Sequence, residues 1–238
     1  WDFLHADEYD YYAYAGAPWI VLIVLGLILL HFALVGAKAG TPPGEANALR
    51  FRFHERIGHL VAMVSVVFLA ITGFCFLMGQ NDPLGPWART LHTWVGYVAV
   101  GGVAFIALIW VLFMLPAQGD FRWLLKGGGY LVPLKEHLPA GKFNAGQKIL
   151  FWLVLVAFGV VAVTGVRMGL ERGAHFPRQE LVYTVHDVAA LAIIVLLMGH
   201  IYLSTVVVPH SLRALFGGRV SDIWAKEHHP NWKYKPTK

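Results

Sequence analysis

Residues 183–209, YTVHDVAALAIIVLLMGHIYLSTVVVP, decide how the rest of the sequence is interpreted. The stretch is long and apolar enough to cross a bilayer as a helix, and it carries His186 near one end and His200 near the other. The two histidines are fourteen positions apart, which on an α-helix is roughly 21 Å along the axis and only about 40° around it. Two imidazoles therefore leave one face of the predicted helix at two depths.

The composition is that of an integral membrane protein. The 238 residues are 57% hydrophobic and 14% charged, and the mean hydropathy is +0.57, which is well above that of a soluble domain. The single cysteine, Cys75, excludes an internal disulfide, a cysteine-ligated iron–sulfur cluster and a c-type haem attachment, because each needs more thiols. The twelve histidines are the remaining candidate ligands for a redox centre.

Long apolar runs divide the chain into five predicted spans of an all-α membrane bundle. A leading helix over residues 18–37 follows an acidic lead-in at 1–17. A four-helix core is predicted over 57–208, and residues 209–238 are expected to form a polar basic tail. The four core helices are expected at 57–79, 91–115, 149–166 and 183–208.

The positive charges predict the topology. Of the 19 Lys and Arg residues, fifteen lie in the segments 38–56, 116–148 and 209–238, and the other four lie in the alternate segments. Five spans place these two groups of segments on opposite sides of the membrane, and basic residues favour the cytoplasmic side. We therefore expect an external N-terminus and a cytoplasmic C-terminus. Because topology explains the net charge of +5, nucleic acid is not an expected partner.

This topology predicts which histidines meet. His59 opens the helix that starts on the cytoplasmic side, level with His200, whereas His92 opens the helix that starts outside, level with His186. Each pair could fill both axial positions of a haem iron, and a haem without an open position suits electron transfer. An ionisable side chain inside a span is costly and marks a functional site. The alternative is that these histidines only form hydrogen bonds between helices.

The other histidines have weaker claims. For His31, hydrogen bonding to a neighbouring helix competes with contact to a haem or quinone. His54 lies five residues before His59, about 140° away around a helix, and would replace it only if that helix began earlier. The remaining six are expected to be solvated: His5, His137, His175, His210, His228 and His229.

Several segments resemble the cytochrome b (gamma) subunit of membrane-bound, quinone-linked formate dehydrogenases, which is related to the cytochrome b subunits of nickel–iron hydrogenases. The resemblance covers roughly residues 50–235. The matching segments are FHERIGH at 53–59, LHTWVG at 91–96, FNAGQK at 143–148, VTGV at 163–166, His186, HIY at 200–202 and WAKEHHPNW at 224–232. The leading helix is the departure from shorter members, and it could pack against a partner subunit or lipid.

Carried over residue by residue, the resemblance implies two haem b groups. One would lie between His59 and His200 on the inner side, and the other between His92 and His186 on the outer side. The resemblance also implies an iron–sulfur (beta) subunit that delivers electrons to the outer haem, and a molybdenum or tungsten catalytic (alpha) subunit that oxidises formate. This chain would then contribute no residue to formate oxidation itself.

The resemblance further implies that menaquinone or ubiquinone is reduced near the cytoplasmic side of a bacterial inner membrane. The family's quinone-binding segment falls on Asn144, Gly146 and Gln147, where the alternative is a cap on the following helix. Two other functions stay open. One is the cytochrome b subunit of a membrane-bound hydrogenase. The other is a non-redox membrane anchor or transporter, although the sequence lacks the internal repeats and broken helices typical of transporters.

Overall fold

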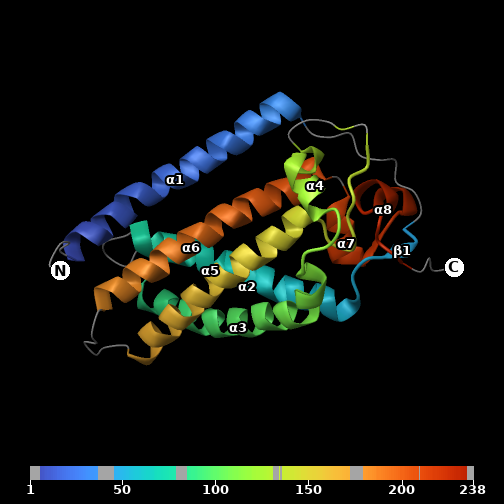
Figure 1. Cartoon of the computed structure of the whole chain (residues 1–238). Helices are drawn as coiled ribbons and strands as arrows, with labels where there is room; N and C mark the ends of the chain where they lie inside the picture. Colours follow the sequence, from blue (N-terminus) through green and yellow to red (C-terminus); the bar gives the residue numbers. More distant parts are fainter. Residues whose placement is uncertain are drawn as a thin grey trace. The chain divides into compact units, whose positions relative to one another are not determined.

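The computed structural model describes residues 6–36, 46–78, 85–130, 134, 136–171, 179–208 and 210–234. Within these residues, five helices are long and apolar enough to cross a membrane, and they correspond to the five expected spans (Figure 1). The long helices are α1 (Ala6–Val35), α2 (Phe53–Met78), α3 (Pro86–Trp110), α5 (Ala145–Leu170) and α6 (Gln179–Tyr202). The predicted all-α membrane fold is confirmed.

Each long helix begins earlier than its expected apolar span. α1 begins at Ala6 rather than residue 18, so most of the expected lead-in is helical and Pro18 lies inside the helix, where it removes one backbone hydrogen bond. α2 begins at Phe53 rather than 57, and α5 at Ala145 rather than 149. The first charged residue marks only the edge of the hydrocarbon region, whereas helical hydrogen bonding continues into the membrane interface.

Two helices change their winding at the C-terminal end. α3 continues as a 3₁₀ helix, η1 (Val111–Met114), and α6 continues as a π-helical turn, η3 (Leu203–Val207), directly after the segment that carries His200. π-helical turns are rare, and they are frequently found at functional sites.

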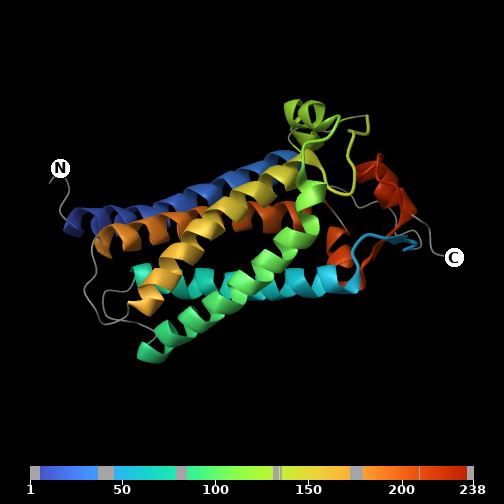
Figure 2. The same ribbon diagram turned by 60° about the horizontal axis from the view of Figure 1, so that its bottom comes forward.

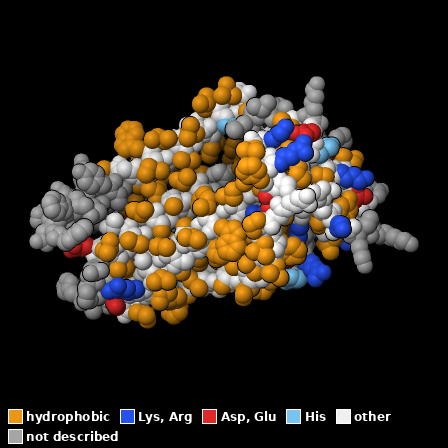
Figure 3. Space-filling model, in the orientation of Figure 1, with side chains coloured by type: hydrophobic (Ala, Val, Ile, Leu, Met, Phe, Trp, Pro, Cys, Tyr) orange, Lys and Arg blue, Asp and Glu red, His pale blue; other side chains and the backbone are white. Residues whose placement is uncertain are grey.

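The spans turn large apolar side chains outward. In each span, at most 22% of the residues in its most apolar window are buried, and hydrophobic side chains cover much of the face seen in Figure 3. Trp19, Trp87 and Trp94 are among the exposed aromatic residues. An apolar surface of this extent is typical of helices that contact lipid or a partner subunit.

The long connection and the C-terminal segment are folded. The connection between α3 and α5 contains α4 (Asp120–Leu125) and a short 3₁₀ helix, η2 (Gly127–Gly129), drawn in yellow-green in Figure 2. The C-terminal segment contains α7 (Ser211–Gly217), β2 (Arg219–Val220) and α8 (Asp222–His228). β2 pairs antiparallel with β1 (Ala48–Leu49), so that Ala48 is opposite Val220.

The expectation of a solvated tail was wrong for His229. Its side chain is buried, and its Nδ1 donates to the carbonyl of Gly141 at 2.7 Å. Trp224 is also buried, and the guanidinium of Arg50 lies over its ring at 4.8 Å. Burial lowers the pKa of His229 well below its usual value, and it lowers the pKa of Arg50 to about 9. The aromatic residues of the C-terminal segment form a small core. The high Lys and Arg content of the segment had led to the prediction of a polar tail instead.

Contacts group the chain into two compact units. The first contains residues 1–26, 59–105 and 154–197, and the second contains 27–58, 106–153 and 198–238. Each long helix contributes residues to both units. The first unit has a core around Ala99, Phe158 and Ile193, and the second has several smaller cores, one of them around Trp110 and Phe143.

Candidate functional site

His92 and His186 belong to the same unit and have matching surroundings. The Nδ1 atom of His92 lies 2.6 Å from Oγ1 of Thr72 on α2, and Nδ1 of His186 lies 2.9 Å from Oγ1 of Thr164 on α5. A threonine on α2 thus holds the ring of His92 in the same way as a threonine on α5 holds the ring of His186.

The hydroxyl groups decide which ring nitrogen carries the proton. Oγ1 of Thr72 donates to the carbonyl of Phe68 at 2.9 Å, and Oγ1 of Thr164 donates to the carbonyl of Val160 at 2.7 Å. A hydroxyl has a single hydrogen, so each oxygen can only accept from the histidine. Nδ1 of each ring therefore carries the proton, and the lone pair lies on Nε2, where it can bind a metal.

Glycines leave room around these rings. A Cβ atom on Gly73 would lie 3.4 Å from Cε1 of His92, and a Cβ on Gly165 would lie 3.2 Å from Cε1 of His186. A Cβ on Gly96, one turn after His92, would meet no other atom within 4 Å. The rings therefore lie against helix backbone, and the face of α3 beside His92 can accept a flat group.

The donor set fits haem b. Neutral imidazoles with a free Nε2 are ligands that haem iron accepts, so His92 and His186 would be suited to hold this group. The sequence from residue 50 to residue 218 matches the family model of prokaryotic cytochrome b561. The chain belongs to this family. It is therefore a membrane cytochrome b, and the family implies that its redox group is haem b.

Curated relatives of this cytochrome b are formate dehydrogenase subunits by name. The cytochrome b556 subunit of formate dehydrogenase from Haemophilus influenzae is 29% identical over 199 residues, covering 79% of this chain and 83% of that protein. The cytochrome b556(Fdn) subunit of the nitrate-inducible enzyme from Escherichia coli K12 is 30% identical over 197 residues, covering 77% and 89%. The E. coli K12 cytochrome b556(fdo) subunit is 29% identical over 193 residues, covering 77% and 90%. The resemblance noted in the sequence is confirmed.

The other two candidate ligands of the cytochrome b lie in different units. His59 belongs to the first unit and His200 to the second, and both side chains are half-buried. Their pairing stays a prediction from the sequence. α2 does begin early enough to include His54, but that side chain is exposed.

His31 of the leading helix is hydrogen-bonded at both ring nitrogens. Its Nε2 lies 3.1 Å from the carbonyl of Tyr130, and its Nδ1 lies 2.6 Å from the hydroxyl of Tyr202. A carbonyl can only accept, so Nε2 carries the proton and Nδ1 accepts from the tyrosine. Of the two alternatives for His31, the structure has the hydrogen-bonding one. This histidine ties α1, which lies outside the family match, to the rest of the second unit.

The predicted quinone segment forms the start of α5. Oδ1 of Asn144 accepts from the backbone N–H of Gln147 at 2.9 Å, and Oε1 of Gln147 accepts from the backbone N–H of Asn144 at 3.0 Å. This reciprocal pair is a capping box. A Cβ on Gly146 would lie 2.7 Å from the buried ring of Trp123, so only glycine fits there. Hydrogen bonds among the described residues involve Oε1 of Gln147 but not its Nε2.

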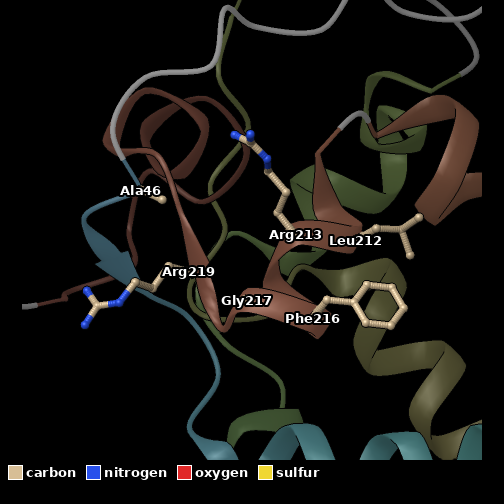
Figure 4. A pocket seen from close by; sticks show the side chains of 6 residues that line it. All are labelled: Ala46, Leu212, Arg213, Phe216, Gly217 and Arg219. Carbon is tan, nitrogen blue, oxygen red and sulfur yellow. The ribbon is translucent and has the colours of Figure 1, made fainter.

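A pocket of about 450 Å³ lies in the second unit and contains no predicted site residue (Figure 4). Apolar and basic side chains line it, and the side chains of Arg213 and Arg219 point in different directions (Figure 4). The lining residues are Ala46, Leu212, Arg213, Phe216, Gly217 and Arg219.

Sequence reasoning assigned no role to Thr72 or Thr164, although Thr164 lies in the VTGV segment that contributes to the resemblance. Each is followed by glycine and preceded by a β-branched residue, as Ile71-Thr72-Gly73 and Val163-Thr164-Gly165. They lie 20 and 22 positions before His92 and His186. This repeated tripeptide at nearly equal spacing was the available signal.

Proposed function

We propose that this chain is the membrane-anchoring cytochrome b subunit of a formate dehydrogenase. It passes electrons from an iron–sulfur subunit to menaquinone or ubiquinone, while a molybdenum or tungsten subunit oxidises formate. Two kinds of finding support the proposal: the family match over residues 50–218, and relatives named as cytochrome b556 subunits of formate dehydrogenase at about this chain's length. Those names favour formate dehydrogenase over the hydrogenase alternative.

The observation that carries the redox role is the matched setting of His92 and His186. Both present Nε2 as a donor, and each is held by a threonine of another helix. We assign this pair to an outer haem b and assign His59 and His200 to an inner one. Haem b, when bound, supplies a one-electron iron couple. The four histidines would hold the two haems through their imidazoles, and an iron held by two histidines would be suited to electron transfer.

Gln147 is the best candidate donor to quinone. Its Oε1 is used in the capping box, whereas its Nε2 can donate to a quinone carbonyl. Asn144 is buried, and within the part of the chain that the structure describes its Nδ2 makes only a long contact of 3.4 Å with the hydroxyl of Tyr130. One of its N–H groups is therefore also suited to this role. Gly146 keeps the segment close to Trp123.

The distribution of charge supports an orientation with a periplasmic N-terminus and a cytoplasmic C-terminus in a bacterial inner membrane, because fifteen of the 19 Lys and Arg residues lie on one side. Gln147 is on that basic side. Oxidation of formate to CO₂ outside releases two electrons and one proton, and reduction of quinone takes two electrons and two protons from the inside. The complex would therefore contribute to a proton-motive force.

A His200→Ala variant of the intact complex tests the electron path. Formate should still reduce the outer haem, whereas quinone reduction should be abolished because the inner iron has lost a ligand. His54→Ala is the matched control, since the side chain of His54 is exposed on α2. Unchanged quinone reduction in His200→Ala would contradict the proposed path.

A Gln147→Glu variant separates quinone binding from helix capping. Glutamate keeps an oxygen acceptor for the backbone N–H of Asn144 but loses the amide donor. We expect the KM for quinone to rise at least tenfold, the scale of one lost hydrogen bond of about 1.4 kcal/mol, while haem content and thermal stability stay unchanged. An unchanged KM would remove Gln147 from the quinone site.

A further inference from the structure

Thr72 and Thr164 take part in contacts that are equivalent in every part. Each lies on the helix that precedes a ligand-bearing helix, donates to the carbonyl four residues earlier and contacts Nδ1 of one histidine. A glycine follows each threonine, and a Cβ at that glycine would lie 3.4 Å or less from the imidazole. The helix pair α2 and α3 and the helix pair α5 and α6 therefore have the same arrangement. In each pair a threonine hydroxyl, an imidazole and the backbone of a glycine lie next to each other.

The hydrogen bond from each threonine hydroxyl to a backbone carbonyl leaves the hydroxyl oxygen only the role of acceptor toward the histidine. A threonine that only fills space would be free to rotate its hydroxyl hydrogen toward Nδ1, which would leave the proton on Nε2 and block that atom as a ligand. The bonds of 2.9 Å from Thr72 to Phe68 and of 2.7 Å from Thr164 to Val160 use that hydrogen. The threonine oxygen therefore enforces the tautomer that presents Nε2.

An Nδ1–H group that donates to oxygen also makes the imidazole a stronger donor at Nε2. Partners of this kind orient the ring and raise the basicity of a metal-bound histidine, and their removal commonly costs 10–100-fold in metal affinity. A stronger donor stabilises ferric iron more than ferrous iron. The effect of two such bonds on one iron is a lower reduction potential.

We propose that Thr72 and Thr164 are positioning residues that orient His92 and His186, fix their tautomers and lower the potential of the haem that these histidines hold. The inference rests on the assignment of His92 and His186 as ligands of one haem in the proposed function. A lower potential at the outer haem makes electron transfer from the outer haem to the inner haem more favourable. The two threonines thereby bias the electron path inward.

The variants Thr72→Val and Thr164→Val test the proposal in the purified complex. Valine keeps the branched shape but cannot accept from Nδ1–H. Each variant should raise the midpoint potential of this haem. A tenfold loss in preference for ferric over ferrous iron would be a rise of about 59 mV for a one-electron couple. The g values of the same ferric haem in its EPR spectrum should shift as well. The potential of the second haem should not change.

Two further variants separate positioning from general damage. Thr72→Ser and Thr164→Ser keep the hydroxyl and should restore the wild-type potential and EPR spectrum. Thr184→Val is the matched control, since the Thr184 hydroxyl donates to the carbonyl of Glu180 at 3.0 Å on the ligand-bearing helix itself, and it should leave both haems unchanged. If a valine variant does not assemble, the alanine variant at the same position removes the same acceptor without a bulky replacement.

The outcomes distinguish the two levels of the argument. If His92→Ala and His186→Ala do not each remove the same haem, the ligand assignment fails. If they do, but the valine variants keep both the wild-type potential and the wild-type g values, the ligand assignment stands and the positioning role of the threonines is wrong. Equal shifts in the serine and valine variants would also overturn it, because they would show that side-chain packing and not the hydroxyl sets the potential.

Discussion

Replacing Glu55 by glutamine should destabilise the second unit strongly. Glu55 is buried at the start of α2, where its carboxylate accepts from the ammonium of Lys142, from the backbone N–H of Arg52 at 2.7 Å and from Nε1 of Trp110 at 2.8 Å. Glutamine keeps an acceptor oxygen but removes the charge. The side chain of Lys142 is only 15% exposed, so its ammonium would be left mostly buried without its partner.

Breaking a buried ion pair from one side costs about 3–5 kcal/mol. We expect the lower end, about 3 kcal/mol, because the Lys142 ammonium also lies over the rings of Phe113 at 4.9 Å and Phe143 at 5.7 Å. The free energy of unfolding can be measured by SDS titration in mixed micelles. Because Lys142→Met removes the stranded charge, the double variant Glu55→Gln/Lys142→Met should recover most of the loss.

The pair between Arg122 and Glu136 is the matched control, since its side chains are 60% and 37% exposed. Glu136→Gln should produce no measurable change in the same titration, because water and salt screen such a pair. A loss below about 0.5 kcal/mol for Glu55→Gln would refute the reasoning, because it would mean that the buried pair is as well solvated as the exposed one.

Three more predictions concern single positions. Gly146→Ala should cost about 1–3 kcal/mol and raise the KM for quinone, because the new Cβ would lie 2.7 Å from the Trp123 ring; a thermal melt and a quinone titration measure the two effects. Gly165→Ala should alter the spectrum and potential of the haem assigned to His186 without altering the other haem, since the new Cβ would lie 3.2 Å from that ring. Burial lowers the pKa of His229 below its usual 6.5, so the unfolded chain takes up a proton at this histidine at a higher pH than the folded chain. The free energy of unfolding should therefore fall by up to about 1.4 kcal/mol per pH unit below 6.5. Unfolding titrations between pH 7.5 and 5.5 should show a weaker dependence of this free energy on pH in His229→Asn.

The membrane fold was predictable because its main determinant is local. An apolar run of about 20 residues must be helical in lipid, so the five spans follow directly from the sequence. Their ends do not, because the helix around Pro18 and the early start of α2 at Phe53 continue where the chain is no longer uncharged. The fold of the C-terminal segment was not predicted for another reason. Its core needs Ala48 opposite Val220, and pairing between residues so distant in sequence leaves no local pattern.

For the candidate site, the sequence predicted the four candidate ligands, and their binding of haem stays a prediction. Histidines inside spans are unusual enough to be noticed, and helix direction alone sorts them by depth. The oxygen atoms that hold them are not predictable this way, because a threonine in a span is common and usually bonds only to its own helix. The contacts of Thr72 and Thr164 with His92 and His186 require the relative rotation of neighbouring helices. A helix cap at Asn144 was expected as the alternative to quinone binding, and the structure has this cap as a capping box. The proposed quinone role would use other atoms of the same segment.

The haem content of double histidine variants tests the central claim most directly. The measurement is the number of b haems per chain, from the reduced-minus-oxidised spectrum of the purified complex. The wild-type protein should hold two, and His92→Ala/His186→Ala should hold one, because both changes affect the same iron. His92→Ala/His200→Ala should hold none, because each iron loses one ligand. Retention of a haem in the second variant, or loss of both haems in the first, would contradict the pairing on which the electron path depends.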